Sequence, residues 1–371
     1  MVDYFISSNS GLDSNQGTSS SLPWKTFTNL SGVTWQPGDT LNLYRGDTFD
    51  TQLLLPGTMN GSITLPIIIQ PYGNGSNPPI LTAGFYGAYS AGVSYMIIQG
   101  LHAQVAAGTG FYSGKGNFVT FLNCSATGCD KGFLISGTNN VVRNCEAYNN
   151  YYGIAIGGDD CLIYENYVHD NNLAENGDGI HVEGISTDSA ERILIYKNVI
   201  ENQINGSSAD NIQVAGYSNN VTIIDNTISK GRGITITNSA SNVKIIGNKF
   251  TSGPSNSKFA IAAALVGGYI EITKNIINFP DTADTGIKIQ SAHADGLVIQ
   301  NNHVYTGSNR ALWHVSGDVN YMRLRRNVYS NNGVANLITW NGVDYSPAQF
   351  SNYQSASGKD SSSLYIKSLI V

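Results

Sequence analysis

One short phrase returns along the chain from about residue 95 onward, and this repetition constrains the fold more than any other feature. Its copies include VTFLNC, LIYEN, TIIDN, VKIIGN and LVIQNN. Aligning the copies puts one residue per repeat in a column, at steps of 21, 21, 32, 28, 22, 27, 27 and 25 residues: Cys124, Cys145, Asn166, Asn198, Asn226, Asn248, Asn275, Asn302 and Asn327. Self-similarity at this spacing predicts a solenoid in which each step is one coil.

A second alternating segment lies within the steps, as in GFLISG, GIHVEG, NIQVAG and GITITN. Apolar residues at every other position predict strands, because successive side chains of a strand point to opposite faces. The expected inward set of one coil is Ile223, Ile228, Ile234 and Ile236. Thr227 and Thr235 are expected to face water.

These patterns predict an all-β fold, a right-handed parallel β-helix of about ten or more coils with strands about 4.8 Å apart. The recurring Asn is expected to be an inward turn residue whose amide hydrogen-bonds to the same residue one coil away. Cys124 and Cys145 share that column and are expected to be stacked thiols rather than a disulfide. No CxxC pair is present, so the Cys do not predict a zinc cluster.

The first 90 residues do not follow the repeat. Their phrases YFISSNSGLDSNQGTSSSLPWKTFTNL, PGDTLNLYRGDTF and PIIIQPYGNGSNPPILTAG resemble the opening of many secreted β-helix proteins of the pectate lyase superfamily. The resemblance implies one continuous domain: an N-terminal cap and first coils over 1–90, repeats over 91–335 and a closing segment over 336–371. It also implies a carbohydrate-active protein that is secreted or displayed at the cell surface.

Chemistry is expected at the two longest coils, whose steps are 32 and 28 residues. Long loops on a rigid scaffold commonly carry functional sites. These loops flank the strands GDGIHVEG and SADNIQVAG, where inward Ile180 and Val182 would leave His181 and Glu183 outside, near Gln213. The residues just before these strands form a further column: Lys131, Tyr152, Asp178, Asp210, Arg232 and, in poorer alignment, Lys258.

Asp178 and Asp210 are predicted to lie one coil apart. Two bare carboxylates about 5 Å apart repel each other, so the pair predicts either a general acid and base or a cation clamp. With Glu183 nearby, the expected cation is Ca²⁺, held by Asp178, Glu183 and Asp210, because Ca²⁺ takes several carboxylate oxygens. Ordinary turn chemistry of Asp before Gly or Asn stays open as an alternative.

The predicted catalytic residues are Asp178, His181, Asp210 and Arg232. The predicted substrate-binding residues are Tyr152, Gln213, Tyr217 and Lys258. Tyrosines gather around the long loops, and flat rings with polar tips suit the faces of sugars.

Three functions are consistent with this pattern. In the first, a polysaccharide lyase acts by β-elimination: a cation neutralises the uronate carboxylate, and Arg232, Lys258 or His181 removes the C5 proton. Acids on successive coils ahead of a basic residue resemble the calcium-dependent pectate lyases. In the second, a glycoside hydrolase uses Asp178 and Asp210, in an order that resembles polygalacturonase-like enzymes. The third is a non-catalytic glycan-binding or phage-adhesion β-helix.

Charge and hydropathy argue against a nucleic-acid-binding protein and against a protein with a membrane-spanning helix. Lys and Arg number 20 against 26 Asp and Glu, a net charge of -6, so no nucleic-acid partner is expected. No apolar run reaches the roughly 18 to 20 residues of a membrane span. The expected partner is a polysaccharide or oligosaccharide; the sequence leaves the oligomeric state open, with a monomer favoured.

Overall fold

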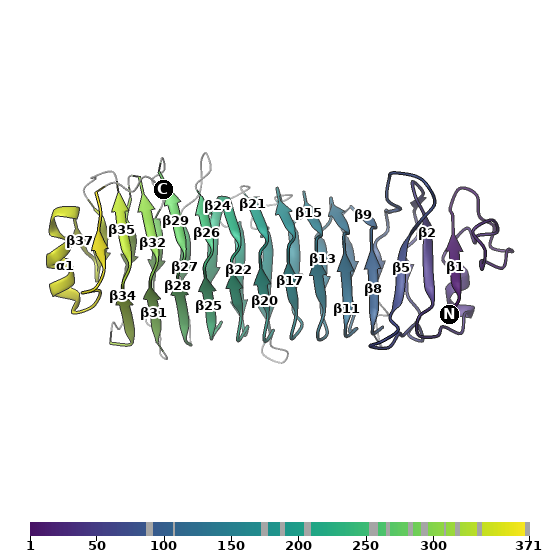
Figure 1. Cartoon of the computed structure of the whole chain (residues 1–371), viewed down its shortest axis with the longest axis horizontal. Coiled ribbons are helices and arrows are strands. Elements are labelled where there is room, and N and C mark those ends of the chain that lie inside the picture. Colours follow the sequence, from purple (N-terminus) through teal and green to yellow (C-terminus); the bar gives the residue numbers. More distant parts are fainter. Residues whose placement is uncertain are drawn as a thin grey trace. The chain divides into compact units, whose positions relative to one another are not determined.

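The computed structural model describes residues 1–86, 92–106, 108–171, 177–185, 190–203, 209–251, 259–264, 268–280, 285–290, 296–307, 309–315, 320–331 and 336–367. The chain forms two compact units, Met1–Leu173 and Ala174–Val371. In each unit short strands lie side by side (Figure 1) and pair in parallel with the equivalent strands of the next coil. The pairings form three stacks, which we call A, B and C. This arrangement is a parallel β-helix, as the repeat predicted.

The first unit contains one 3₁₀ helix and three stacks of strands. The 3₁₀ helix is η1 (Thr28–Gly32). Stack A contains β1 (Asp3–Ile6), β2 (Thr40–Tyr44), β5 (Ile67–Tyr72), β8 (Met96–Gln99), β11 (Val119–Leu122), β14 (Val141–Arg143) and β17 (Leu162–Tyr164). Stack B contains β3 (Thr48–Phe49), β6 (Ile80–Leu81), β9 (His102–Gln104), β12 (Ser125–Thr127), β15 (Glu146–Tyr148) and β18 (Tyr167–His169). Stack C contains β4 (Leu53–Leu54), β7 (Phe85–Tyr86), β10 (Thr109–Tyr112), β13 (Lys131–Ile135) and β16 (Tyr152–Ile156).

The second unit repeats the plan. Stack A contains β20 (Leu194–Tyr196), β23 (Thr222–Ile224), β25 (Val243–Ile246), β28 (Ile270–Thr273), β31 (Leu297–Gln300) and β34 (Met322–Arg325). Stack B contains β21 (Val199–Gln203), the start of β24 (Thr227–Ile236), β26 (Lys249–Thr251), β29 (Ile276–Phe279), β32 (His303–Thr306), β35 (Val328–Asn331) and β38 (Leu364–Tyr365). Stack C contains β19 (Ile180–Gly184), β22 (Asp210–Gly216), the end of β24, β27 (Phe259–Ala263), β30 (Thr285–Ile289), β33 (Leu312–His314) and β36 (Ile338–Trp340).

The core is made of apolar side chains stacked on their equivalents one coil away. In stack A of the second unit Ile223 pairs with Ile245, Ile245 with Ile272, and Ile272 with Ile299, all fully buried. The predicted inward set is confirmed, since each of its four Ile is at most 1% exposed. The expectation for Thr235 is wrong: Thr235 is 4% exposed because its hydroxyl bonds to a buried carboxylate described below.

The turn from stack A to stack B has the same construction in successive coils. Asp225, with φ 54°, precedes buried Asn226, and Lys274, with φ 57°, precedes buried Asn275. The column residues hydrogen-bond to one another: Asn226 Nδ2 donates to Asn248 Oδ1 at 2.9 Å, and the contact recurs along the column to Asn327. These bonds help offset the cost of the left-handed residue before each turn, about 1 to 2 kcal/mol.

The Cys columns are filled by thiols. All four Cys are buried and free. The backbone N–H of Cys124 lies 3.4 Å from the Cys145 sulfur. The prediction of stacked thiols is therefore confirmed.

The predicted closing segment contains an antiparallel strand and a helix that the sequence did not predict. Strand β37 (Val343–Tyr345) pairs antiparallel with β36 and is followed by η2 (Pro347–Gln349) and α1 (Phe350–Ser357). Buried Tyr353 of α1 donates its hydroxyl to Asp360 at 2.9 Å and its ring lies 5.9 Å from that of Trp340. Within the described part of the chain, no helix has the length and hydrophobicity needed to cross a membrane.

Candidate functional site

The predicted catalytic residues gather on stack C of the second unit. In β19 the side chains of Ile180 and Val182 are fully buried, whereas His181 and Glu183 lie on the outer face. His181 pairs in register with Gln213 of β22, and Gln213 with Thr235 of β24. The orientation that the alternation predicted for these strands is therefore confirmed.

Asp178 lies two residues before β19 and holds His181. Its Oδ2 lies 2.7 Å from His181 Nδ1, and its Oδ1 accepts the backbone N–H of Asp210 at 2.8 Å. The intervening Gly179 is required by space, because a Cβ there would lie 2.7 Å from the carbonyl oxygen of Asn211. Asp178 is only 2% exposed, so it orients the imidazole from within the protein.

The other ring nitrogen of His181 faces Glu183. Nε2 lies 3.1 Å from Glu183 Oε2, and the Glu183 side chain is 54% exposed. Burial lowers the pKa of His181, but the hydrogen bonds and negative charges of Asp178 and Glu183 outweigh it, so the net pKa is raised. The two carboxylates therefore favour the protonated form of the imidazole.

Asp210 is enclosed more completely than the sequence suggested. It is 0% exposed, and its carboxylate accepts the Thr235 hydroxyl at 2.7 Å and the Gln213 amide at 3.3 Å. Burial raises the pKa of Asp210 to about 7, and the neighbouring Asp178 adds to the rise. The positive charge of Arg232 and the hydrogen bonds from Thr235 and Gln213 lower this pKa in part.

Arg232 lies one coil beyond Asp210, directly opposite it in the strand register. Its Nε is 3.0 Å from Asp210 Oδ1, without the alignment of a hydrogen bond. Its guanidinium lies 5.0 Å from the centre of the Phe259 ring, and 18% of the side chain is exposed. Arg232 therefore lies between a buried carboxyl group and an aromatic ring, with part of its side chain at the surface.

The three acids predicted to hold Ca²⁺ are already engaged. Both oxygens of Asp178 and both of Asp210 face donors, and Glu183 contacts His181. Among the described residues no three His, Cys, Asp or Glu side chains are grouped in a way that would hold a metal ion. The arrangement does not fit a three-carboxylate calcium site, and calcium binding stays a prediction.

The predicted substrate-binding residues have different outcomes. Gln213 reaches the site, where it donates to Asp210. Tyr217 directly follows β22 and is 51% exposed. Tyr152 belongs to the first unit, where its ring lies 4.4 Å from that of Tyr151 and 5.8 Å from Lys131 Nζ. Lys258 lies outside the described residues.

Thr235 was expected to face water but binds Asp210. Two other contributing residues, Phe259 and Asn211, were not predicted. Phe259 supports Arg232. Phe259 lies two residues before Ile261, which pairs with Ile234, so it occupies the column position that the poorer alignment gave to Lys258. Buried Asn211 donates to the Arg232 carbonyl at 2.9 Å, and its Oδ1 has no hydrogen bond. A one-residue correction of the repeat register would have identified Phe259.

Part of the chain is similar in sequence to a known enzyme. A lacto-N-biosidase of Bifidobacterium longum subsp. longum is 35% identical over 89 residues, which are 23% of this chain and 6% of the relative. The matching region is thus a small part of that relative.

Two solved structures share the fold at low sequence identity. The A-module of the Azotobacter vinelandii mannuronan C-5 epimerase AlgE6 has a TM-score of 0.62 at 14% identity, covering 90% of this chain and 92% of its own. A mannuronic acid specific polysaccharide family 6 lyase from human gut microbiota has a TM-score of 0.58 at 14% identity, covering 91% and 83%.

The family model described as "Right handed beta helix region" matches residues 76–206, 110–277 and 168–352. These segments cover more than half of the chain and include every described residue of the candidate site. The chain belongs to the right-handed β-helix family.

Proposed function

We propose that this protein is a polysaccharide lyase that cleaves a uronate-containing polymer by β-elimination, with His181 as the base and Arg232 as the partner of the uronate carboxylate. The observation that carries the proposal is the difference in exposure between these two side chains and the two carboxylates that contact them. The side chains of His181 and Arg232 are 10% and 18% exposed, whereas those of Asp178 and Asp210, which hold them, are 2% and 0% exposed.

The histidine has the contacts that a general base needs. Asp178 fixes Nδ1 as the protonated nitrogen, which leaves Nε2 to accept a proton from substrate. For Nε2 to accept the proton, Glu183, whose side chain is 54% exposed, has to leave this nitrogen when substrate enters. The imidazole then accepts the C5 proton, the C4–oxygen bond breaks as the C4–C5 double bond forms, and the imidazolium returns its proton to the leaving oxygen.

Arg232 supplies the charge that makes the C5 proton acidic. Its guanidinium pairs with a carboxylate in a planar, two-point geometry. Phe259 and Asp210 fix the side chain, so less entropy is lost when substrate binds. His181 precedes Asp210 by one coil and Arg232 follows it by one coil, so the two strands are about 10 Å apart, which two long side chains can span.

A hydrolase is the second candidate, because a carboxyl with a pKa of about 7 beside a second carboxylate is what a general acid and base pair requires. This pair, Asp178 and Asp210, would act on a glycosidic bond directly. The burial of both groups opposes that role, since neither carboxylate exposes an edge to substrate. Because the Bifidobacterium relative is named a lacto-N-biosidase, hydrolysis is tested together with elimination.

The test is an assay for the unsaturated product. An eliminase leaves a double bond that absorbs in the ultraviolet, whereas a hydrolase produces reducing ends without absorbance. Mannuronate polymers are the first substrates, followed by other uronate polymers and neutral polysaccharides, because two fold neighbours are named for mannuronan or mannuronic acid.

Matched variants decide the roles. His181→Gln and Arg232→Gln are expected to reduce the elimination rate by about a hundredfold or more. His303→Gln and Arg325→Gln, which alter exposed residues on other stacks, are expected to leave it unchanged. Reducing ends without absorbance, lost in Asp178→Asn and Asp210→Asn, would establish the hydrolase instead. No cleavage of any polymer would favour a glycan-binding or adhesion role.

The proposal places the protein where large acidic polysaccharides occur, outside the cell or at its surface. It requires no calcium for the steps above. If Ca²⁺ binds this region, it does so by displacing the donors that now occupy Asp178 and Asp210.

A further inference from the structure

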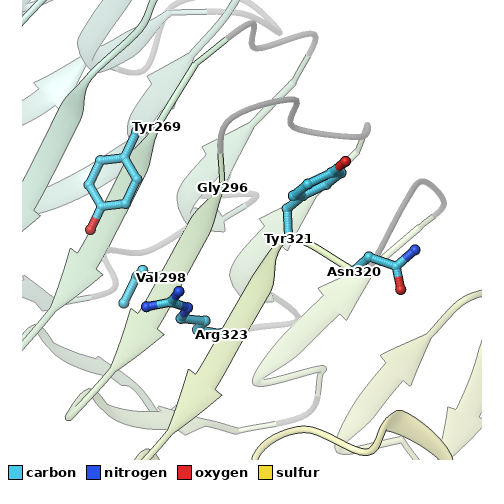
Figure 2. Close-up of a pocket in the computed structure, with 6 residues that line it drawn as sticks. All are labelled: Tyr269, Gly296, Val298, Asn320, Tyr321 and Arg323. Carbon is cyan, nitrogen blue, oxygen red and sulfur yellow. The ribbon is translucent and has the colours of Figure 1, made fainter.

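A recess lies on stack A of the second unit. It has a volume of about 260 Å³ and is lined by Tyr269, Gly296, Val298, Asn320, Tyr321 and Arg323 (Figure 2). The lining comes from three successive coils, those of β28, β31 and β34. None of these residues belongs to the candidate active site on stack C.

The recess exists because the middle coil carries small residues where its neighbours carry large ones. Val298 of β31 pairs in register with Glu271 on one side and with Arg323 on the other. Gly296, whose φ is 118°, lies in the same coil between those of Tyr269 and Tyr321. Two strand spacings, about 10 Å, therefore separate the larger side chains.

The walls combine aromatic rings with one cation. Tyr321 is 54% exposed and stands at one edge of the recess. Figure 2 shows Arg323 reaching from its own strand toward Val298, with Tyr269 on the far side of Val298. Burial, the negative charge of Glu271 and a hydrogen bond between these two side chains raise the pKa of Tyr269, and the positive charge of Arg323 acts in the opposite direction.

This chemistry selects a class of ligand. Exposed tyrosine rings suit the apolar faces of sugar rings, and their hydroxyls suit sugar hydroxyls. Arg323 is the one cation of the described lining, and the acid Glu271 lies two coils away from it. One guanidinium suits a single carboxylate better than a phosphate, because phosphates are bound by clusters of cations. A volume below that of drug-sized pockets suits one sugar ring rather than several.

We propose that this recess is a non-catalytic binding site for one uronate residue, in which Arg323 pairs with the carboxylate and Tyr321 stacks on the ring. It would hold the polymer on stack A while the candidate active site works on stack C. That the sugar is a uronate rests in part on the proposed function, whereas binding at the recess is measured without catalysis. Its described lining includes no acid, His or Cys that would act as a base or nucleophile.

The experiment is titration calorimetry of the full chain carrying His181→Gln, so that substrate is not consumed. The probes are a mannuronate trisaccharide and neutral maltotriose. Tyr321→Ala is expected to weaken uronate binding at this site about three- to tenfold, and Tyr321→Phe to keep most of it, because the ring is retained. Arg323→Gln is expected to weaken it about tenfold or more.

Arg325→Gln is the matched control, since it removes the same charge two residues away on β34, where the side chain is exposed and bonds to Gln300. It is expected to leave uronate binding unchanged. Maltotriose binding is expected to be unaffected by Arg323→Gln, because it has no carboxylate. In the otherwise unaltered chain, Tyr321→Ala is expected to keep kcat on a trisaccharide and to raise KM on the polymer.

Several outcomes would overturn this inference. The first is that the parent, Tyr321→Ala and Arg323→Gln bind uronate equally. The second is that Arg325→Gln weakens binding as much as Arg323→Gln does. The third is that no uronate binds at all. If elimination is absent but uronate binding still depends on Tyr321 and Arg323, the proposed function fails and the binding site stands. If elimination occurs without this dependence, the proposed function stands and the binding site fails.

Discussion

Replacing Asn226 with Leu tests the register of the whole solenoid. Asn226 is fully buried, and its Oδ1 accepts the backbone N–H and the side-chain amide of Asn198 at 2.9 and 3.0 Å. Its own amide donates to the Ile195 carbonyl at 3.0 Å and to Asn248 Oδ1 at 2.9 Å. Leu has a similar size but can make none of these bonds.

The magnitude follows from the groups that lose a partner. The Asn198 N–H loses this acceptor and the Ile195 carbonyl loses this donor, and each buried group left unsatisfied costs about 1 to 3 kcal/mol. Burial of the Leu side chain returns about 1.5 to 3 kcal/mol. We therefore expect the free energy of unfolding to fall by about 1 to 3 kcal/mol.

Urea denaturation followed by circular dichroism measures this change as a lower midpoint at an unchanged slope. The control is Asn278→Leu, since Asn278 lies on β29 facing away from the core and its change is expected to stay within about 0.5 kcal/mol. If Asn226→Leu is as stable as the parent, or if the control loses as much, the reasoning about the buried column is refuted.

Three further predictions concern the candidate site. Because the pKa of His181 is raised, the elimination kcat/KM is expected to rise with pH through a midpoint above 6.5. Asp178→Asn is expected to lower that midpoint, and Asp225→Asn is the control. A pH profile that is unchanged in Asp178→Asn would contradict the pairing of Asp178 with His181. The pKa of Asp210 is about 7 in the folded chain and 3.8 as its ordinary value, so the folded state keeps this proton to a higher pH than the unfolded state does. The free energy of unfolding should therefore fall as pH rises from about 4 to 7. Asp210→Asn should remove this part of the pH dependence, as measured by denaturation at several pH values. If Asp178, Glu183 and Asp210 hold Ca²⁺ as the sequence predicted, calcium should raise the melting temperature and Asp210→Asn should abolish the rise, whereas the contacts described above predict the same melting temperature with calcium and with chelator.

The fold could be predicted because its information is local and repeated. Alternation identified the strands, and the column from Cys124 to Asn327 identified the coils. The closing helix α1 was missed because it occurs once and carries no periodic pattern. Its place depends on Tyr353 filling the end of the core, which a scan for repeats does not detect.

The candidate site was predicted in position but not in detail. Alternation placed His181 and Glu183 outside, and the column placed Asp210 opposite Arg232. The alignment failed at the next coil, where Phe259 and not Lys258 continues the column. A loop of uncertain length between two strands shifts such an alignment by one residue without changing the alternating pattern.

The sequence by itself determined the period of the coils, the inward apolar set and the face on which the polar groups meet, because the side-chain alternation of a strand is a property of the backbone. Only the tertiary structure decided which of those polar groups are buried. Asp178 and Asp210 were placed in one column by the repeat, but their burial follows from the donors that other coils supply. Burial, charge and hydrogen bonding together set a pKa, and each depends on atoms that lie one coil, and therefore some 20 to 30 residues, away.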